Sequence, residues 1–163
     1  MRRRSSVILI LGALVCAGCS YSNESLIDPQ YQTVYVEMFD NQSWYRGFEV
    51  GLTRELVNTI NSRTHLRIVP KGHAQTIITG QISDYKKTVL TEDVDDNVRE
   101  LQVSLVVDMT WSDRDTGRPI RVVRNFVRSE QIKRDLGETL ETANTELFRD
   151  TAEELVERLE ADW

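Results

Sequence analysis

The clearest hydrophobic pattern in the chain is a strict alternation between residues 101 and 111. Six apolar side chains fall on one face of an extended segment: Leu101, Val103, Leu105, Val107, Met109 and Trp111. Polar residues fall on the other face: Gln102, Ser104, Asp108 and Thr110. Because successive side chains of a strand point to opposite faces, this pattern predicts a sheet with one buried and one solvated face.

Other extended segments surround this strand. Two short β-branched runs, 33–39 and 66–69, enclose a helical segment, which predicts a crossover with parallel strands. The long run "TIITGQISDYKKTVL" (76–90) precedes the acidic turn "TEDVDDN". The arginine-rich run "IRVVRNFVRS" (120–129) follows the turn "DRDTGRP" and is typical of an edge strand.

The first helix is predicted over "WYRGFEVGLTRELVNTINS", where an apolar residue recurs at every fourth position: Phe48, Leu52, Leu56 and Ile60. Asn41 or Ser43 is suited to cap it. Gly47 and Gly51 would each cost about 1 kcal/mol inside a helix. Both are therefore predicted to be packing positions that let the helix approach the sheet.

A second, C-terminal helix is predicted over residues 140–159, and its acidic face is interpreted as solvated. The elements together predict an α/β (α+β) two-layer sandwich. Its mixed sheet of four to five strands carries two amphipathic helices on one face, in the order β-α-β-β-β-(β)-α. Leu105→Ala and Leu155→Ala should each cost about 2–5 kcal/mol in the main core, and Glu154→Ala about 0.5 kcal/mol or less.

The N-terminus, "MRRRSSVILILGALVCAGCSYS", has the positive, apolar and small-residue order of a secretory signal. Its apolar run is shorter than the roughly 20 residues that a membrane-spanning helix needs. The only cysteines, Cys16 and Cys19, lack the folded setting and further ligands of a C-x-x-C redox or zinc motif.

Ala17 and Gly18 before Cys19 instead resemble a bacterial lipobox, in which the cysteine is acylated, for example with palmitate, and begins the mature chain. The alternative is an ordinary secreted protein with an incidental cysteine. The predicted organisation is a signal peptide over 1–18, a lipidated tether over 19–31 and one domain over 32–163. No cofactor is expected besides the covalent lipid on Cys19.

Removal of the signal leaves 17 basic against 26 acidic residues, a formal charge of −9. Such a charge argues against binding nucleic acid, which requires neutralised phosphates. His65 and His73 lack metal-ligand spacing, the acidic run 92–96 lacks the pattern of a calcium loop, and no nucleophile motif occurs. We therefore expect neither an enzyme nor a metal site. Core and staple roles are expected for the three tryptophans: Trp44, Trp111 and Trp163.

Charge is unevenly distributed. Residues 113–134 hold seven basic and three acidic side chains, a local balance of +4. This segment is suited either to an anion such as a phosphorylated lipid or to ion pairs with the acidic C-terminal helix. Arg124 and Arg128 are four apart, so on a regular strand they share a face, which suits both interpretations.

The lipobox and four ordered segments resemble the LptE family of lipopolysaccharide-assembly lipoproteins. These segments are "TVYVEMFDNQSWYRGFEVGLTRELVNTINSRTHLRIVP", "TIITGQISDY", "RELQVSLVVDMTWSDRDTGRPI" and "FRDTAEELVERLEADW". The resemblance implies two helices on a sheet and a lipid anchor on the periplasmic face of the outer membrane. It also implies a role as the plug of an LptD-like barrel, which assists barrel assembly and lipopolysaccharide insertion.

The resemblance carries lipopolysaccharide contact over to Lys133 and Arg134, just before the last helix. The hairpin tip, 91–97, departs from the family because it is acidic rather than basic. With Arg124 and Arg128 of the basic segment, these are the candidate lipopolysaccharide-contacting residues. The alternative function is a generic periplasmic lipoprotein that scaffolds or pilots another envelope complex without binding lipopolysaccharide.

Overall fold

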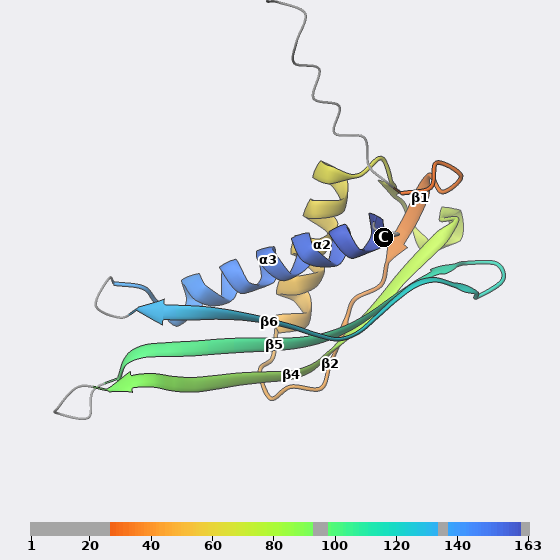
Figure 1. Ribbon diagram of the computed structural model, residues 1–163. Coiled ribbons are helices and arrows are strands. Elements are labelled where there is room, and N and C mark those ends of the chain that lie inside the picture. The colour runs from red at the N-terminus through yellow and green to blue at the C-terminus, as the bar shows by residue number, and fades with distance from the viewer. Residues whose placement is uncertain (1–26, 93–97, 134–136, 161–163) are drawn as a thin grey trace, which may run out of the picture.

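The structure, a computed structural model, describes residues 27–92, 98–133 and 137–160 (Figure 1). Four features singled out by the sequence therefore lie outside the described residues: the lipobox with Cys19, Arg134, Trp163 and the acidic tip 93–97. The element order is β1 (Thr33–Val36), β2 (Asp40–Asn41), α2 (Phe48–Arg63), β3 (Arg67–Ile68), a 3-10 turn (Lys71–His73), β4 (Thr76–Glu92), β5 (Val98–Asp113), β6 (Pro119–Lys133) and α3 (Leu140–Glu160).

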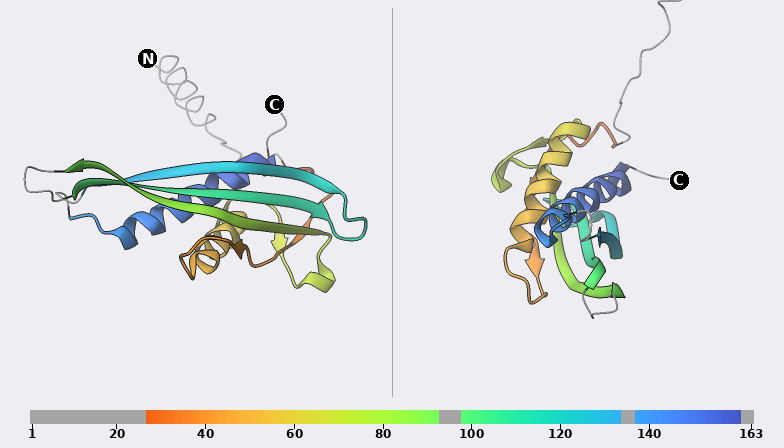
Figure 2. Two further views of the ribbon diagram at one scale, coloured as in Figure 1. Left: turned by 90° about the horizontal axis from the view of Figure 1, so that it is seen from below. Right: turned by 90° about the vertical axis from the view of Figure 1, so that its left-hand side faces the viewer.

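One mixed sheet runs in the order β3-β1-β4-β5-β6, and the two-residue strand β2 pairs with β4 beside this path. β1 pairs in parallel with both β3 and β4, which confirms the predicted crossover. β4, β5 and β6 form a long antiparallel meander with β6 at the edge. α2 and α3 lie on the same side of the sheet (Figure 2). The two-layer α+β sandwich is therefore confirmed, with β2 as an additional strand.

The core lies between this sheet face and the two helices. The alternating residues of β5 from Val103 to Trp111 are almost fully buried, and Leu147, Ala152 and Leu155 of α3 are buried with them. The core also includes Ile27, which is only 2% exposed, and Tyr31, whose ring packs edge-on against Trp111 with centroids 5.2 Å apart. Two residues of the segment expected to be a tether, Ile27 and Tyr31, are thus packed against the domain, while residues 28–30 are exposed.

α2 begins at Phe48, four residues later than predicted. Gly47 adopts φ +88°, a left-handed conformation that interrupts the helical path and that glycine tolerates without strain. A β-carbon on Gly47 would meet nothing within 4 Å, so its predicted packing role is wrong. For Gly51 the packing role is correct, but its neighbour is α3 rather than the sheet. A β-carbon there would lie 2.8 Å from the ring of Phe148.

An aromatic cluster joins the loop before α2, both helices and β4. Tyr45 stacks on Phe48 at 5.4 Å and meets Tyr85 edge-on at 4.6 Å, while Phe48 also contacts Phe148 at 5.0 Å between ring centroids. The Tyr85 hydroxyl donates a 2.8 Å hydrogen bond to the side-chain oxygen of Asn144 on α3. Burial, reinforced by neighbouring Tyr45, raises the pKa of Tyr85 to about 12, so this hydroxyl keeps its proton.

Candidate functional site: the basic edge strand and the outer sheet face

A β-bulge in β6 decides where its arginines point. Val123 pairs with Met109 and Phe126 pairs with Val107, so two residues of β6, Arg124 and Asn125, stand opposite Asp108 alone. Asn125 adopts φ +50°, a conformation that asparagine tolerates better than most residues. The extra residue reverses the alternation of side chains along the strand. The prediction that Arg124 and Arg128 share a face is therefore wrong, because it assumed a regular strand.

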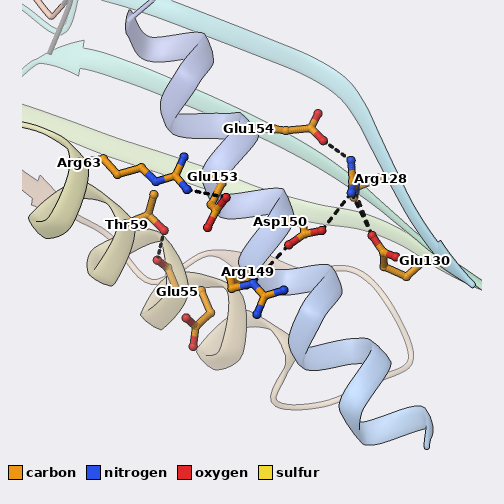
Figure 3. Close-up of polar contacts among 9 residues, drawn as sticks. All are labelled: Glu55, Thr59, Arg63, Arg128, Glu130, Arg149, Asp150, Glu153 and Glu154. Atoms are coloured by element: carbon orange, nitrogen blue, oxygen red, sulfur yellow. Dashed lines mark hydrogen bonds and ion pairs between the residues drawn. The ribbon is translucent and has the colours of Figure 1, made fainter. Parts of the chain in front are cut away.

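Arg128 points toward the helices and makes ion pairs with three carboxylates (Figure 3). Its Nη2 atom lies 3.0 Å from both Glu130 Oε1 and Asp150 Oδ2, and Nη1 donates to Glu154 Oε1. Burial opposes the charge, but the hydrogen bond to Glu130 and the nearby carboxylates hold the pKa of Arg128 above its ordinary value. Of the two interpretations of the basic segment, ion pairing with the acidic helix describes Arg128.

The acidic face of α3 is consequently not simply solvated. Besides Asp150 and Glu154, Glu153 lies 2.7 Å from the guanidinium of Arg63 at the end of α2, and Glu157 lies 3.7 Å from it (Figure 3 shows the first pair). These contacts join α3 both to the other helix and to the edge strand.

Arg124 lies on the outer face of the sheet, the face away from α2 and α3. It borders a shallow groove of about 500 Å³ whose other lining residues are Gln81, Asp108, Thr110, Gly117, Pro119, Val122 and Val123. Asp108 accepts hydrogen bonds from Gln81 (3.0 Å), from the Ser83 hydroxyl (2.6 Å) and from the backbone N–H of Asn125 (2.8 Å). These three donors, with Gln81 the strongest, lower the pKa of Asp108. Asp108 thus stabilises the bulge through its hydrogen bond with the Asn125 N–H.

Lys133 is the last residue of β6 and is exposed. Its backbone N–H donates to the Glu138 carboxylate at 2.7 Å, which ties the end of the strand to the approach to α3. The predicted candidates therefore do not form one basic patch. Arg128 faces the helices, Arg124 faces outward beside the bulge, and Lys133 lies at the far end of the strand.

The outer face is mostly polar. Four of the five β5 side chains that it presents between residues 101 and 111 are polar, the exception being Val106. Polar contacts lie on this face both between strands, as for Ser104 with Ser129 at 2.8 Å, and along β4, where Lys86 lies 3.2 Å from Asp84. Within the described ranges, no group of three or more His, Cys, Asp or Glu side chains is placed to hold a metal ion.

The core or staple role expected for Trp44 is wrong, because its side chain is 98% exposed. Trp44 precedes Phe48 by four residues and so fits the spacing of the helical stripe, but the left-handed Gly47 lies between them. Gly47, four residues after the turn sequence "DNQS", was the available signal that the helix begins later.

Several solved structures share this fold. The chain is similar to an uncharacterized lipoprotein B from Nitrosomonas europaea, with TM-score 0.63, 14% identity and coverage of 88% of this chain and 91% of that one. It is also similar to a minor lipoprotein from Acinetobacter baumannii, with TM-score 0.51, 11% identity and coverage of 80% and 94%. A third similar structure is the PelC dodecamer of Paraburkholderia phytofirmans, with TM-score 0.51, 14% identity and coverage of 80% and 92%.

The family model described as LptE, lipopolysaccharide-assembly, matches residues 31–162. The chain therefore belongs to the LptE family, a non-enzymatic family of envelope lipoproteins that are not known to need a cofactor. No curated protein matches the chain. Among the described residues, no helix is long and apolar enough to cross a membrane.

Proposed function

We propose that this protein is the outer-membrane lipoprotein that plugs an LptD-like barrel, assists its assembly and helps to insert lipopolysaccharide. The observation that carries the proposal is the family match over residues 31–162, which spans both helices and the whole sheet. The proposed anchor is the acylated Cys19, which would hold the domain on the periplasmic face of the membrane.

The outer sheet face is compatible with a plug. The interior of a large transmembrane barrel is polar, so a protein that fills it needs a polar surface rather than a continuous apolar one. The face formed by β4, β5 and β6 provides carboxylate, hydroxyl and ammonium groups, from Asp108, Ser104 and Lys86 among others. Both helices cover the opposite face, so this one is available to a partner.

Affinity isolation of the intact lipoprotein from envelopes of its own host tests the partnership. We expect an LptD-like barrel to be recovered in stoichiometric amounts. Recovery of a secretin, or of no barrel, would reject the plug function and favour the generic scaffold or pilot lipoprotein.

Direct lipopolysaccharide contact is a separate part of the proposal. Lys133 is the favoured described candidate because it is exposed and lies just before the last helix, where the family resemblance implies the contact. Lys133→Glu and Arg134→Glu should each weaken lipopolysaccharide binding by the isolated complex, because phosphate groups are recognised by cations. Arg124→Glu tests whether the outer groove also takes part. The guanidinium of Arg128 already pairs with three carboxylates, so it is the weakest of the four candidates. Unchanged binding in the Lys133 and Arg134 variants would remove these residues from the lipid contact.

A further inference from the structure

The loop between β2 and α2, residues 42–47, presents a fully exposed indole. Its Trp44 is 98% exposed, whereas the aromatic residues on either side of it in the sequence belong to the core cluster. Tyr45 lies next to it and stacks on Phe48, and both meet Tyr85. An apolar cluster is thus within a few residues of Trp44, yet the indole stays in solvent. We call residues 42–47 the Trp44 loop.

Hydrogen bonds fix the backbone of the Trp44 loop. The Asn41 side chain accepts from the Ser43 N–H (2.9 Å) and donates to the Tyr45 carbonyl and to Glu49, both at 2.7 Å. The Ser43 hydroxyl in turn accepts from the Tyr45 N–H at 3.3 Å. Residues on both sides of Trp44 are therefore held by Asn41.

The far end of the loop is fixed by the helix itself. The Gly47 N–H donates to the Glu49 carboxylate at 3.1 Å, so one carboxylate links Asn41 to the start of α2. The hydrogen bond from Asn41, with the backbone donors, lowers the pKa of Glu49, which keeps this link charged at neutral pH. The loop is a rigid support, and a side chain displayed on a rigid support loses little freedom when a partner covers it.

Other apolar side chains surround this end of α2. Met38 and Val50 are 54% and 49% exposed. The residue after Met38, Phe39, is bonded through its N–H to Thr53 on α2 at 3.1 Å, and Val50 lies one turn before Thr53. Three of the large apolar side chains exposed in the described residues, Met38, Trp44 and Val50, thus belong to the start of α2 and the segment beside it.

The position of the loop favours a protein over the lipid bilayer as its partner. The described chain starts at the other end of α2, where the Tyr31 carbonyl lies 2.9 Å from the ring nitrogen of His65, just after the helix ends. The 16 residues of α2 span about 24 Å. The described chain therefore begins near one end of the helix, and the Trp44 loop lies at the opposite end (Figure 1 shows α2 between the first described residues and this loop). The chain that leads to the lipid proposed on Cys19 thus joins the domain at the end of α2 away from the Trp44 loop.

We propose that Trp44 is the anchor residue of the contact with the barrel protein, its indole entering an apolar pocket on that partner. Tryptophan is enriched among the few residues that dominate protein interfaces, and rigid presentation is what such residues need. This inference rests on the proposed function, because the barrel is the partner named there.

Hydroxyl-radical footprinting of the full-length lipoprotein, read by mass spectrometry of its peptides, tests the contact directly. Trp44 should be oxidised rapidly in the free protein and, in the isolated barrel complex, at a rate close to that of Trp111, the buried internal control. If Trp44 stays reactive in the barrel complex, the inference is wrong while the proposed function stands. If vesicles of phosphatidylethanolamine and phosphatidylglycerol alone protect Trp44, its partner is the bilayer and the inference is also wrong. If no barrel is recovered, the proposed function fails and the inference fails with it.

Substitution tests the energetic role of the indole. Trp44→Ala should lower the affinity for the barrel about tenfold or more, and Trp44→Phe should restore part of it. Both variants should unfold at the wild-type midpoint, because the side chain is in solvent. Val89→Ala, which removes an exposed apolar side chain near the end of β4 and outside the outer sheet face, is the matched control. Equal losses in Trp44→Ala and Val89→Ala, or no loss in Trp44→Ala, would overturn the assignment.

Discussion

At the scale of single residues, Arg124 and Arg128 have different environments, although both belong to the basic segment of β6. Arg128 forms ion pairs with Glu130, Asp150 and Glu154, whereas Arg124 lies on the outer sheet face beside the bulge. Arg128→Met should destabilise the domain by about 1–3 kcal/mol, because three carboxylates lose their shared cation. Arg124→Met should stay within about 0.5 kcal/mol.

Urea unfolding at low and high salt measures both variants. The deficit of Arg128→Met should shrink as salt rises, because the repulsion among the remaining carboxylates is screened. Equal stabilities for the two variants would contradict the opposite placement of the two arginines.

Close neighbours leave no room for a side chain at Gly80. A β-carbon there would lie 2.5 Å from the ring of Phe39 and 2.9 Å from the carbonyl oxygen of Asp108 on β5. Because the second neighbour is backbone of the paired strand, Gly80→Ala should cost about 1–3 kcal/mol. Gly72→Ala, where a β-carbon meets nothing within 4 Å, is the control and should be near neutral in the same thermal unfolding experiment.

At the scale of elements, the apolar residues of α3 and β5 belong to one buried core cluster, which also includes residues of α2 and β4. Leu105 and Leu155 are fully buried, so Leu105→Ala and Leu155→Ala should each cost about 2–5 kcal/mol. Glu154→Ala, expected from the sequence to be nearly neutral, should instead cost more than an exposed substitution, because Glu154 pairs with Arg128. Glu146→Ala, exposed on α3, is the suitable control and should stay within about 0.5 kcal/mol in denaturant unfolding.

Because Asp108 is bonded to the bulge of β6, the stability of the domain should depend on pH. The pKa of Asp108 is lowered by Gln81, Ser83 and the Asn125 N–H, so ionised Asp108 favours the folded state. That contribution is complete above the unfolded pKa of about 3.9 and is lost as pH falls through the lower folded pKa. Asp108→Asn should therefore be less stable than wild type at pH 6, and the difference should shrink below about pH 4.

Unfolding midpoints of wild type and Asp108→Asn across this range measure the difference, with Glu146→Gln as a surface control. A difference that stays constant between pH 6 and pH 3 would mean that the Asp108 charge does not hold the bulge.

The success of the sequence analysis differed among elements for physical reasons. β5 was predictable because its alternation runs unbroken from Leu101 to Trp111 and one whole face is buried. The start of α2 was not, because Trp44 fits the helical spacing while Gly47 turns left-handed. The side-chain directions predicted for β6 after Arg124 were also wrong. Nothing in "VVRNFVR" indicates an inserted residue except an asparagine, which tolerates positive φ.

The candidate site was predicted less well than the fold. Composition located the basic segment, but the partners of Arg128 come from α3, more than 20 residues further along the chain. Trp44 was overlooked for a related reason. A hydrophobic residue in a sequence suggests burial, and only the packing of Tyr45 on Phe48 reveals that the indole of the preceding residue is left outside.

At the scale of the whole molecule, the lipid anchor and the folded domain should be separable. Ile27 is the first described residue and is already buried in the core, so Cys19→Ser should abolish acylation without changing the unfolding midpoint of the domain. Mass spectrometry of the mature N-terminal peptide should show lipid on Cys19 in the wild type only. An unmodified wild-type N-terminus, or one that retains Arg2 to Arg4, would reject the lipoprotein processing.

The burial of Ile27 also limits the length of the tether between the lipid and the domain. Eight residue steps separate it from Cys19, a contour of at most about 28 Å. With Cys19 in the membrane, the domain would be confined to a thin layer beside it, and its encounter with a membrane-embedded partner would become a search over a surface instead of a volume. Effective concentration near the membrane, rather than the number of copies in the cell, would then govern assembly. Lengthening the tether by an insertion after Ser20 would lower this effective concentration.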